Sequence, residues 1–130
     1  RHPSDDRLSG IYGTILYDDL GVLGGDGGGG PLHQRNVTIF ADGEVDRSPC
    51  GSGTAARVAL LADEGRLDGG RVLRHDSIVG STFTARVAGT VEAEGRTAVL
   101  PEVEGMAYRT GEHRFTLDPR DPVGSGFVLR

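Results

Sequence analysis

The chain has 130 residues, the size of one ordinary domain, and a formal net charge of −5. This acidity, with arginines scattered among Asp and Glu, argues against nucleic acid as a partner. All 14 basic residues are arginine, so Schiff-base chemistry and a P-loop lysine are excluded from this chain. No apolar run approaches the roughly 20 residues that span a bilayer, and the first ten residues do not resemble a secretory signal. We therefore expect one soluble, cytoplasmic domain over residues 1–130.

Two strands are predicted in the first third of the chain. Residues 11–17 are β-branched and aromatic, and residues 36–41 follow the same pattern. The glycine-rich run between them, residues 21–31, is predicted to be a flexible surface loop, because its composition cannot bury enough surface to offset its ordering entropy. A phosphate-binding role would need a following helix and a Lys-Ser/Thr pair, which the sequence lacks.

A helix is predicted to begin at Thr54, because the segment is rich in Ala and Leu and Gly65 is placed as a C-cap. Residues 58–62 leave almost no polar face, which predicts a helix surrounded by other structure. The remaining strand-like segments are residues 71–80, 81–95, 96–105, 106–119 and 126–130. This order predicts the α+β class, with an antiparallel or mixed, barrel-like sheet wrapped round one central helix.

The only cysteine, Cys50, lies between Pro49 and Gly51, just before the predicted helix. A single cysteine can form neither an internal disulfide nor a Cys-rich zinc site. The first turn of a helix has unpaired N–H groups and a partial positive charge, so the amides of Gly51 and Ser52 suit a carboxylate. The same field favours the thiolate form of a nearby cysteine. A buried, inert thiol is the alternative.

Asp46 lies four residues before Cys50. A substrate with its carboxylate on the Gly51 and Ser52 amides and its ammonium on Asp46 would turn the carbon between them toward the thiol. That arrangement suits proton abstraction next to a carboxylate. Alternatives remain open: Asp46 as an acceptor for backbone N–H groups in the turn, and Ser52 as a simple helix N-cap. The histidines lack metal-ligand spacing and are interpreted as surface or turn residues: His2, His33, His75 and His113.

Residues 46–57, DRSPCGSGTAAR, resemble the second catalytic segment of the proline racemase family. This family includes 4-hydroxyproline 2-epimerases and trans-3-hydroxyproline dehydratases. Residues 35–45, 80–87 and 104–130 are also similar to the family pattern. The resemblance implies a diaminopimelate-epimerase-like fold of two similar domains with the active site between them. This chain would be the C-terminal half of such an enzyme.

The resemblance also implies roles for particular residues. No cofactor and no metal are used, and two cysteines, one from each domain, face each other across the substrate α-carbon. Cys50 is then one acid/base, Asp46 holds the substrate amine, and the amides of Gly51 and Ser52 bind the carboxylate. Phe40 is an aromatic wall for a pyrrolidine ring. The implied partners are a small amino acid, proline or hydroxyproline, and the missing N-terminal domain with the second cysteine. A homodimer is a separate expectation, because an isolated half would expose its inter-domain face.

Two functions follow from the resemblance, and a third follows from the amides of Gly51 and Ser52 alone. Cys50 favours a racemase or epimerase of proline or hydroxyproline, because dehydratases of the family typically have Thr at this position and need only one thiol. Dehydration of trans-3-hydroxy-L-proline is the alternative, because the neighbouring segments are as similar to dehydratases as to epimerases. The third interpretation is a non-catalytic fragment that binds a carboxylate.

Overall fold

The computed structural model describes residues 2, 4–24 and 29–126. Its elements are the 3-10 turns η1 (Asp6–Leu8) and η2 (Asp68–Gly70), the helix α1 (Gly51–Asp63), and the strands β1 (Gly13–Val22), β2 (Leu32–Phe40), β3 (Leu73–Ser77), β4 (Thr82–Ala93) and β5 (Arg96–Gly105). The strands form one sheet in the order β1-β2-β3-β4-β5. The predicted α+β class is confirmed. None of the described helices is long and apolar enough to cross a membrane.

The sheet is mixed. Strands β1 and β2 pair antiparallel, with Gly13 opposite Phe40 and Ile15 opposite Thr38. Strands β2 and β3 pair parallel, which requires a crossover connection, and α1 lies in that connection. Strands β3, β4 and β5 follow as an antiparallel meander. The crossover carries residues 41–72 over one face of the sheet, and this places the start of α1 beside the end of β2.

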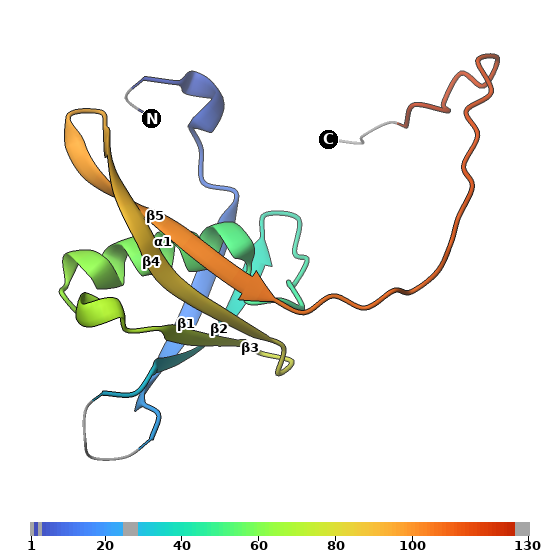
Figure 1. Ribbon diagram of the computed structural model, residues 1–130. Coiled ribbons are helices and arrows are strands. Elements are labelled where there is room, and N and C mark those ends of the chain that lie inside the picture. Colours follow the sequence, from blue (N-terminus) through green and yellow to red (C-terminus); the bar gives the residue numbers. More distant parts are fainter. Residues whose placement is uncertain (1, 3, 25–28, 127–130) are drawn as a thin grey trace.

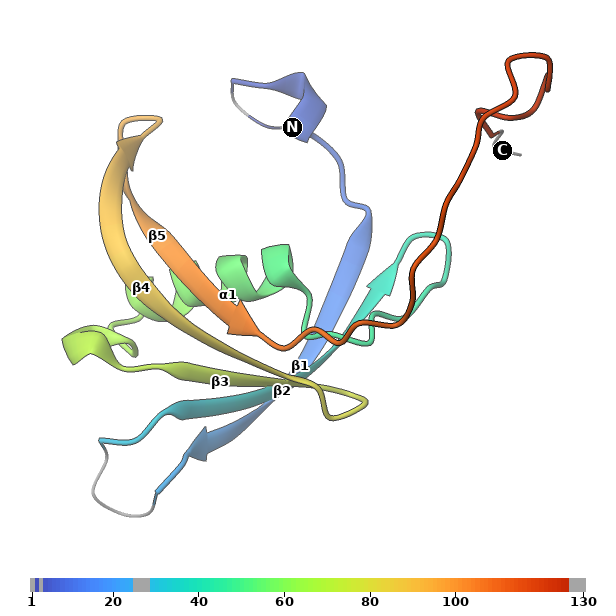
Figure 2. The ribbon, with the colours of Figure 1, turned by 45° about the vertical axis from the view of Figure 1, so that its right-hand side comes forward.

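The core lies between α1 and the hollow face of the curled sheet (Figure 1, Figure 2). Val58 and Leu61 of the helix are fully buried against Leu32 of β2, Leu73 of β3 and Ala85 of β4. Burying a side chain of this size contributes roughly 1.5–3 kcal/mol. The helix therefore stays on the sheet through a short apolar stripe centred on its second half.

The sheet is not a closed barrel, and this corrects one expectation. Strands β1 and β5 are its edges and do not pair with each other in the described chain. The helix is consequently covered on one side only, and Leu60 is 56% exposed beside the fully buried Leu61. The prediction of a surrounded helix was wrong for this chain, because the edge strands β1 and β5 do not pair and the sheet stays open on one side of α1. The apolar composition of residues 58–62 does not reveal which polypeptide covers them.

The segment after β5 contradicts a second prediction. Residues 106–126 contain no helix or strand and run away from the sheet in both views (Figure 1, Figure 2). The strand predicted over 106–119 is therefore wrong: its alternation is strand-like, but the described chain gives it no neighbouring strand to pair with. Large apolar side chains on it are exposed: Met106, Tyr108, Phe115, Leu117 and Val123. Residues 25–28 of the glycine-rich run and most of the strand predicted over 126–130 lie outside the described residues.

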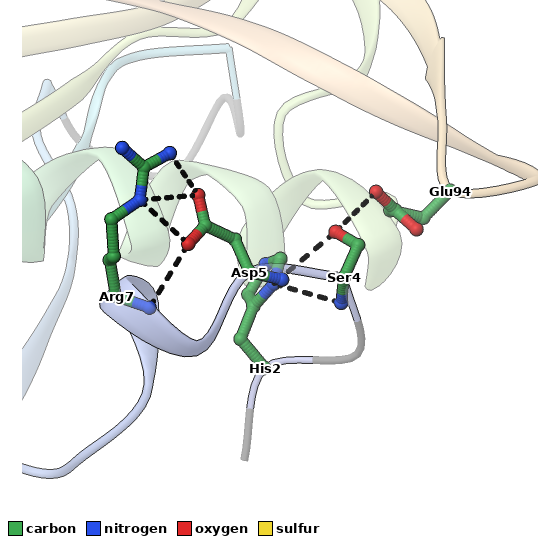
Figure 3. Close-up of polar contacts among 5 residues, drawn as sticks. All are labelled: His2, Ser4, Asp5, Arg7 and Glu94. Carbon is green, nitrogen blue, oxygen red and sulfur yellow. Dashed lines mark hydrogen bonds and ion pairs between the residues drawn. The ribbon is translucent and has the colours of Figure 1, made fainter.

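Polar contacts join the N-terminal turn to the β4–β5 hairpin (Figure 3). The Ser4 hydroxyl donates to Glu94 Oε1 at 2.7 Å. Asp5 accepts a hydrogen bond from the Arg7 N–H at 3.0 Å and forms an ion pair with the Arg7 guanidinium at 2.7 Å. His2 Nδ1 accepts from the Asp5 N–H at 3.1 Å. Because these groups are largely exposed, the contacts orient the turn and add little stability.

A buried carboxylate links three neighbouring strands on the face of the sheet opposite α1. Asp76 of β3 accepts hydrogen bonds from Thr82 of β4 at 2.6 Å and from Arg74 at 3.2 Å, and it pairs with His33 of β2 at 2.7 Å. Burial alone would raise the pKa of Asp76, but these hydrogen bonds lower it to about 2. His33, expected on the surface or in a turn, is thus part of the sheet and holds β2 in register with β3.

Candidate active site

A cavity of about 290 Å³ lies beside the start of α1, close to the lower limit of about 300 Å³ for small-molecule pockets. Three predicted site residues line it: Cys50, Ser52 and Phe40. The other lining residues come from the segment leading into β1, from β1 itself, from β2 and from α1: Gly10, Ile11, Tyr12, Gly13, Ile15, Thr38 and Gly53. The sequence interpretation missed the residues before and in β1. The pairing of Gly13 with Phe40 brings them to the cavity.

Cys50 is the residue immediately before α1 and is 8% exposed. Its backbone has φ 64° and ψ 117°, which is uncommon for a residue with a side chain. The Sγ atom lies 3.6 Å from the Ser52 hydroxyl. The thiol is therefore largely buried, as the structural alternative predicted, and yet it lines the cavity.

The helix begins earlier than predicted, at Gly51 instead of Thr54. Its first backbone hydrogen bond runs from the Thr54 N–H to the Cys50 carbonyl at 2.8 Å. The N–H groups of Gly51, Ser52 and Gly53 precede that bond and belong to the helix end that carries partial positive charge. Ser52 is not the N-cap, because Cys50 occupies that position. Gly51 and Ser52 are both exposed.

Asp46 is half-buried and does not line the cavity. Its Oδ1 accepts a hydrogen bond from the Ser48 N–H at 2.8 Å, and its own N–H donates to the Thr38 carbonyl at 3.0 Å. The Ser48 hydroxyl in turn accepts from the Cys50 N–H at 3.0 Å. Asp46 therefore shapes the turn that leads to the thiol, as the backbone-bonding alternative predicted. Its contact with a substrate amine stays a prediction.

Buried polar groups surround the peptide that precedes Cys50. Asn36 Nδ2 and the Thr54 hydroxyl both donate to the Pro49 carbonyl, at 2.8 and 3.2 Å. His75 Nδ1 lies 3.0 Å from Thr54 Oγ1. Because the Thr54 hydrogen goes to Pro49, His75 Nδ1 donates to Thr54 and its Nε2 carries no hydrogen.

The prediction that His75 is a surface or turn residue is wrong, since it is 1% exposed. It lies in β3 with its side chain toward α1, and single-sequence alternation could not show which face of β3 is covered. No group of three or more His, Cys, Asp or Glu side chains that could hold a metal is present in the described ranges.

Burial, together with the positive charge of Arg57, lowers the pKa of His75 to about 4, and the negative charge of Asp76 opposes part of this shift. His75 is accordingly neutral at neutral pH, which suits its donation from Nδ1 to Thr54. Protonation would place a charge among the buried polar groups next to Cys50.

The folding stability of the chain is expected to decrease as the pH falls from 6.5 to about 4. Between these pH values the unfolded state binds a proton at His75 and the folded state does not. The contribution of neutral His75 to the free energy of unfolding is therefore fully present above pH 6.5 and is lost on acidification. At about 1.4 kcal/mol for each pKa unit, the loss is roughly 3 kcal/mol. Urea titrations at several pH values measure it. His75→Asn keeps a donor toward Thr54 and removes the titration, so an equally steep loss in that variant would contradict the assignment.

Comparisons with known proteins agree with these features. The chain matches the family model described as proline racemase over residues 1–128. It is 43% identical over 129 residues to the trans-3-hydroxy-L-proline dehydratase of Bacillus thuringiensis subsp. konkukian, and this match covers 99% of this chain and 36% of that protein. It is 45% identical over 97 residues to the 4-hydroxyproline epimerase of Brucella ovis, which covers 75% of this chain and 29% of that protein.

The structure is similar to that of a hydroxyproline epimerase from Agrobacterium vitis, crystallised with bound trans-4-hydroxy-L-proline. The TM-score is 0.74 at 38% sequence identity, and the match covers 98% of this chain and 34% of the other. The chain thus spans about a third of the length of the relatives it matches. Because the family model covers nearly all of its residues, the chain belongs to the proline racemase family.

Proposed function

We propose that this chain supplies one of the two acid/base thiols of a cofactor-independent racemase or epimerase that acts on proline or hydroxyproline. The observation that carries the proposal is the position of Cys50: its side chain lines the cavity at the start of α1, together with Ser52 and Phe40. Membership of the family and the likeness to hydroxyproline epimerases support it.

The helix start is the proposed carboxylate site. The N–H groups of Gly51 and Ser52 precede the first backbone bond of α1, and a carboxylate there would meet both these donors and the positive end of the helix dipole. Because Sγ of Cys50 lies 3.6 Å from the Ser52 hydroxyl, a small amino acid bound in this way would bring its α-carbon close to the sulfur.

The reaction then needs only proton transfers. The Cys50 thiolate takes the α-proton and becomes a thiol, and the electron pair of the broken C–H bond moves into the carboxylate. Backbone N–H groups that hold the carboxylate stabilise this developing charge. A second thiol delivers a proton to the opposite face, so that one C–H bond is broken, one is formed and the stereocentre is inverted. Phe40, at the end of β2, would cover the ring.

Asp46 is the proposed partner of the substrate ammonium. Within the described residues, the Asp46 side chain accepts one hydrogen bond, at Oδ1 from the Ser48 N–H. The second carboxylate oxygen, Oδ2, is left for the amine. Because Asp46 lies outside the cavity lining, the amine would reach it across the mouth of the cavity.

The rest of the site is proposed to come from further polypeptide. The chain spans about a third of the length of the relatives it matches, and one face of α1 is exposed in the described residues, where Leu60 is 56% exposed. A second domain with the same sheet-and-helix plan, as in the diaminopimelate-epimerase-like arrangement, would bring the second thiol opposite Cys50. It would also cover the exposed side of α1.

Dehydration of trans-3-hydroxy-L-proline is the second candidate. One observation favours it: over nearly the whole chain, the identity is 43% to a dehydratase and 38% to the hydroxyproline epimerase from Agrobacterium vitis. Elimination of water needs a base on one face of the substrate only. In that reaction the second thiol would be the base, and Cys50 would have no proton to transfer.

Product analysis in D₂O separates the candidates. The full-length protein is incubated with trans-4-hydroxy-L-proline, trans-3-hydroxy-L-proline and L-proline, and the products are resolved by chiral chromatography and mass spectrometry. Epimerisation is expected, with one deuteron on the α-carbon of each inverted product. A cyclic imine that reacts with 2-aminobenzaldehyde would instead establish the dehydratase. If neither product forms but the chain binds pyrrole-2-carboxylate in a calorimeter, the non-catalytic interpretation is correct.

A further inference from the structure

The backbone of Cys50 is held in an unusual conformation. Only two non-glycine residues in the described chain have positive φ, Cys50 and Glu94, and Glu94 lies in the tight turn between β4 and β5. A residue with a side chain stays in such a conformation only when its surroundings hold it there, and residues of this kind cluster at functional sites. The contacts around Cys50 therefore indicate what keeps the thiol in place.

Hydrogen bonds fix the peptide groups on both sides of Cys50. On the N-terminal side, the Pro49 carbonyl accepts from Asn36 Nδ2 at 2.8 Å and from Thr54 Oγ1 at 3.2 Å. The Cys50 N–H donates to the Ser48 hydroxyl at 3.0 Å. On the C-terminal side, the Cys50 carbonyl accepts from the Thr54 N–H at 2.8 Å. Thr54 thus holds both carbonyls that flank the rotatable bonds of Cys50.

His75 orients the Thr54 hydroxyl. It donates from Nδ1 to Thr54 Oγ1 at 3.0 Å, and this contact leaves the single hydroxyl hydrogen of Thr54 to point at Pro49. Asn36, Thr54 and His75 are each at most 2% exposed, so water cannot replace their hydrogen bonds. Asn36 Oδ1 and His75 Nε2 have no hydrogen-bond partner among the described residues, so these two side chains make their side-chain hydrogen bonds through Nδ2 and Nδ1. Those bonds, together with that of Thr54, set the direction of the Pro49 carbonyl.

We propose that Asn36, Thr54 and His75, here called the Pro49 clamp, are positioning residues that keep Cys50 at positive φ and thereby hold its Sγ in the cavity beside the helix start. Asn36 and Thr54 act directly on the Pro49 carbonyl, and His75 acts through Thr54. None of the three needs to touch the substrate. The catalytic meaning of the Pro49 clamp rests on the proposed function, whereas the position of the thiol does not.

Alkylation of Cys50 by iodoacetamide tests the clamp on this chain without any turnover. Thr54→Val removes the hydroxyl at nearly constant volume, and Thr54→Ser keeps it. Release of the carbonyl lets Cys50 relax to negative φ, which turns its Cβ away from the cavity. We expect Thr54→Val to slow alkylation roughly tenfold, equivalent to about 1.4 kcal/mol, and Thr54→Ser to stay within about twofold of the parent chain.

The sign of the effect distinguishes positioning from loss of structure. Partial unfolding exposes the thiol and would accelerate alkylation, so a faster Thr54→Val variant would overturn the inference, as would an unchanged one. Equal slowing in Thr54→Ser would show that side-chain volume matters and the hydroxyl does not, with the same consequence.

Asn36→Ala removes the other donor to the same carbonyl and gives the same test if Thr54→Val fails to fold. Because both residues act on one atom, their effects in the double variant are expected to be non-additive. Additive slowing would contradict a shared clamp. Alkylation measures only the accessibility of the thiol. It can therefore support the clamp even where product analysis rejects epimerisation, and it can reject the clamp where product analysis supports epimerisation.

Discussion

Replacement of Cys50 by Ser in the full-length protein is expected to abolish epimerisation of the substrate. A serine hydroxyl in place of the thiol is a far weaker base at neutral pH, and a positioned acid/base contributes about 10²–10⁴-fold to rate. Turnover measured by polarimetry should therefore fall by at least about 100-fold. The cavity should keep its shape, because Ser is close in size to Cys and the hydrogen bonds around residue 50 involve its backbone.

Isotope exchange makes this prediction sharper. In a two-thiol enzyme, the remaining thiol can still remove and return the α-proton on its own face without inversion. Cys50→Ser is therefore expected to exchange deuterium into one epimer of the substrate and not into the other. Calorimetric binding of pyrrole-2-carboxylate, which should persist, is the control for an intact site. Full turnover in the variant, or equal loss of exchange from both epimers, would rule out Cys50 as one of two separate bases.

Leu61→Ala is expected to destabilise the chain by about 3 kcal/mol, within the usual range of about 2–5 kcal/mol for truncating a buried leucine. Leu61 is fully buried in the stripe that holds α1 on the sheet, and its loss leaves a cavity there. Leu60→Ala is the matched control, because Leu60 is the preceding residue on the same helix and is 56% exposed. Its expected effect in the chain is about 0.5 kcal/mol or less. Urea denaturation measures both.

The same pair of variants tests whether further polypeptide covers α1. If a second domain packs on the exposed side of the helix, Leu60→Ala should lower the free energy of unfolding clearly more in the full-length protein than in this chain. Leu61→Ala should lower it by about the same amount in both. An equally small effect of Leu60→Ala in the two settings would show that this face of α1 stays in contact with water.

Strand β2 shows why the site could be predicted only in part. Its apolar residues are Leu32, Val37, Ile39 and Phe40, and strict alternation would place Val37 and Ile39 on the inner face of the sheet. In the structure Ile39 is 38% exposed, whereas the polar residues Gln34, Asn36 and Thr38 are at most 2% exposed. The inner face of β2 carries Leu32 in the core and polar side chains beyond it: Gln34 accepts a hydrogen bond from Arg57, and Asn36 donates to the Pro49 carbonyl in the turn before α1. The polar side chains at alternate positions of this central strand were the sequence feature that could have predicted a polar inner face.

The helix and the thiol could be predicted because they depend on local sequence. Ala and Leu favour a helix over residues 54–63 through their intrinsic propensity. Cys50 precedes this segment in the chain and therefore lies at the start of the helix. The resemblance of residues 46–57 to the catalytic segment of the family could also be recognised from the sequence, because the matching residues are consecutive in the chain. Membership of the family was confirmed by the family match, and the catalytic role of residues 46–57 stays a prediction.

By itself, then, the sequence determined the fold class, the approximate helix and the one thiol at its start. Only the tertiary structure decided that the sheet stays open, that residues 106–126 form no strand, that His75 is buried and that Asp46 serves the turn. The physical reason is common to all four. Each of the four depends on which other part of the molecule packs against or hydrogen-bonds to the residues concerned. Local propensity carries no information about that partner.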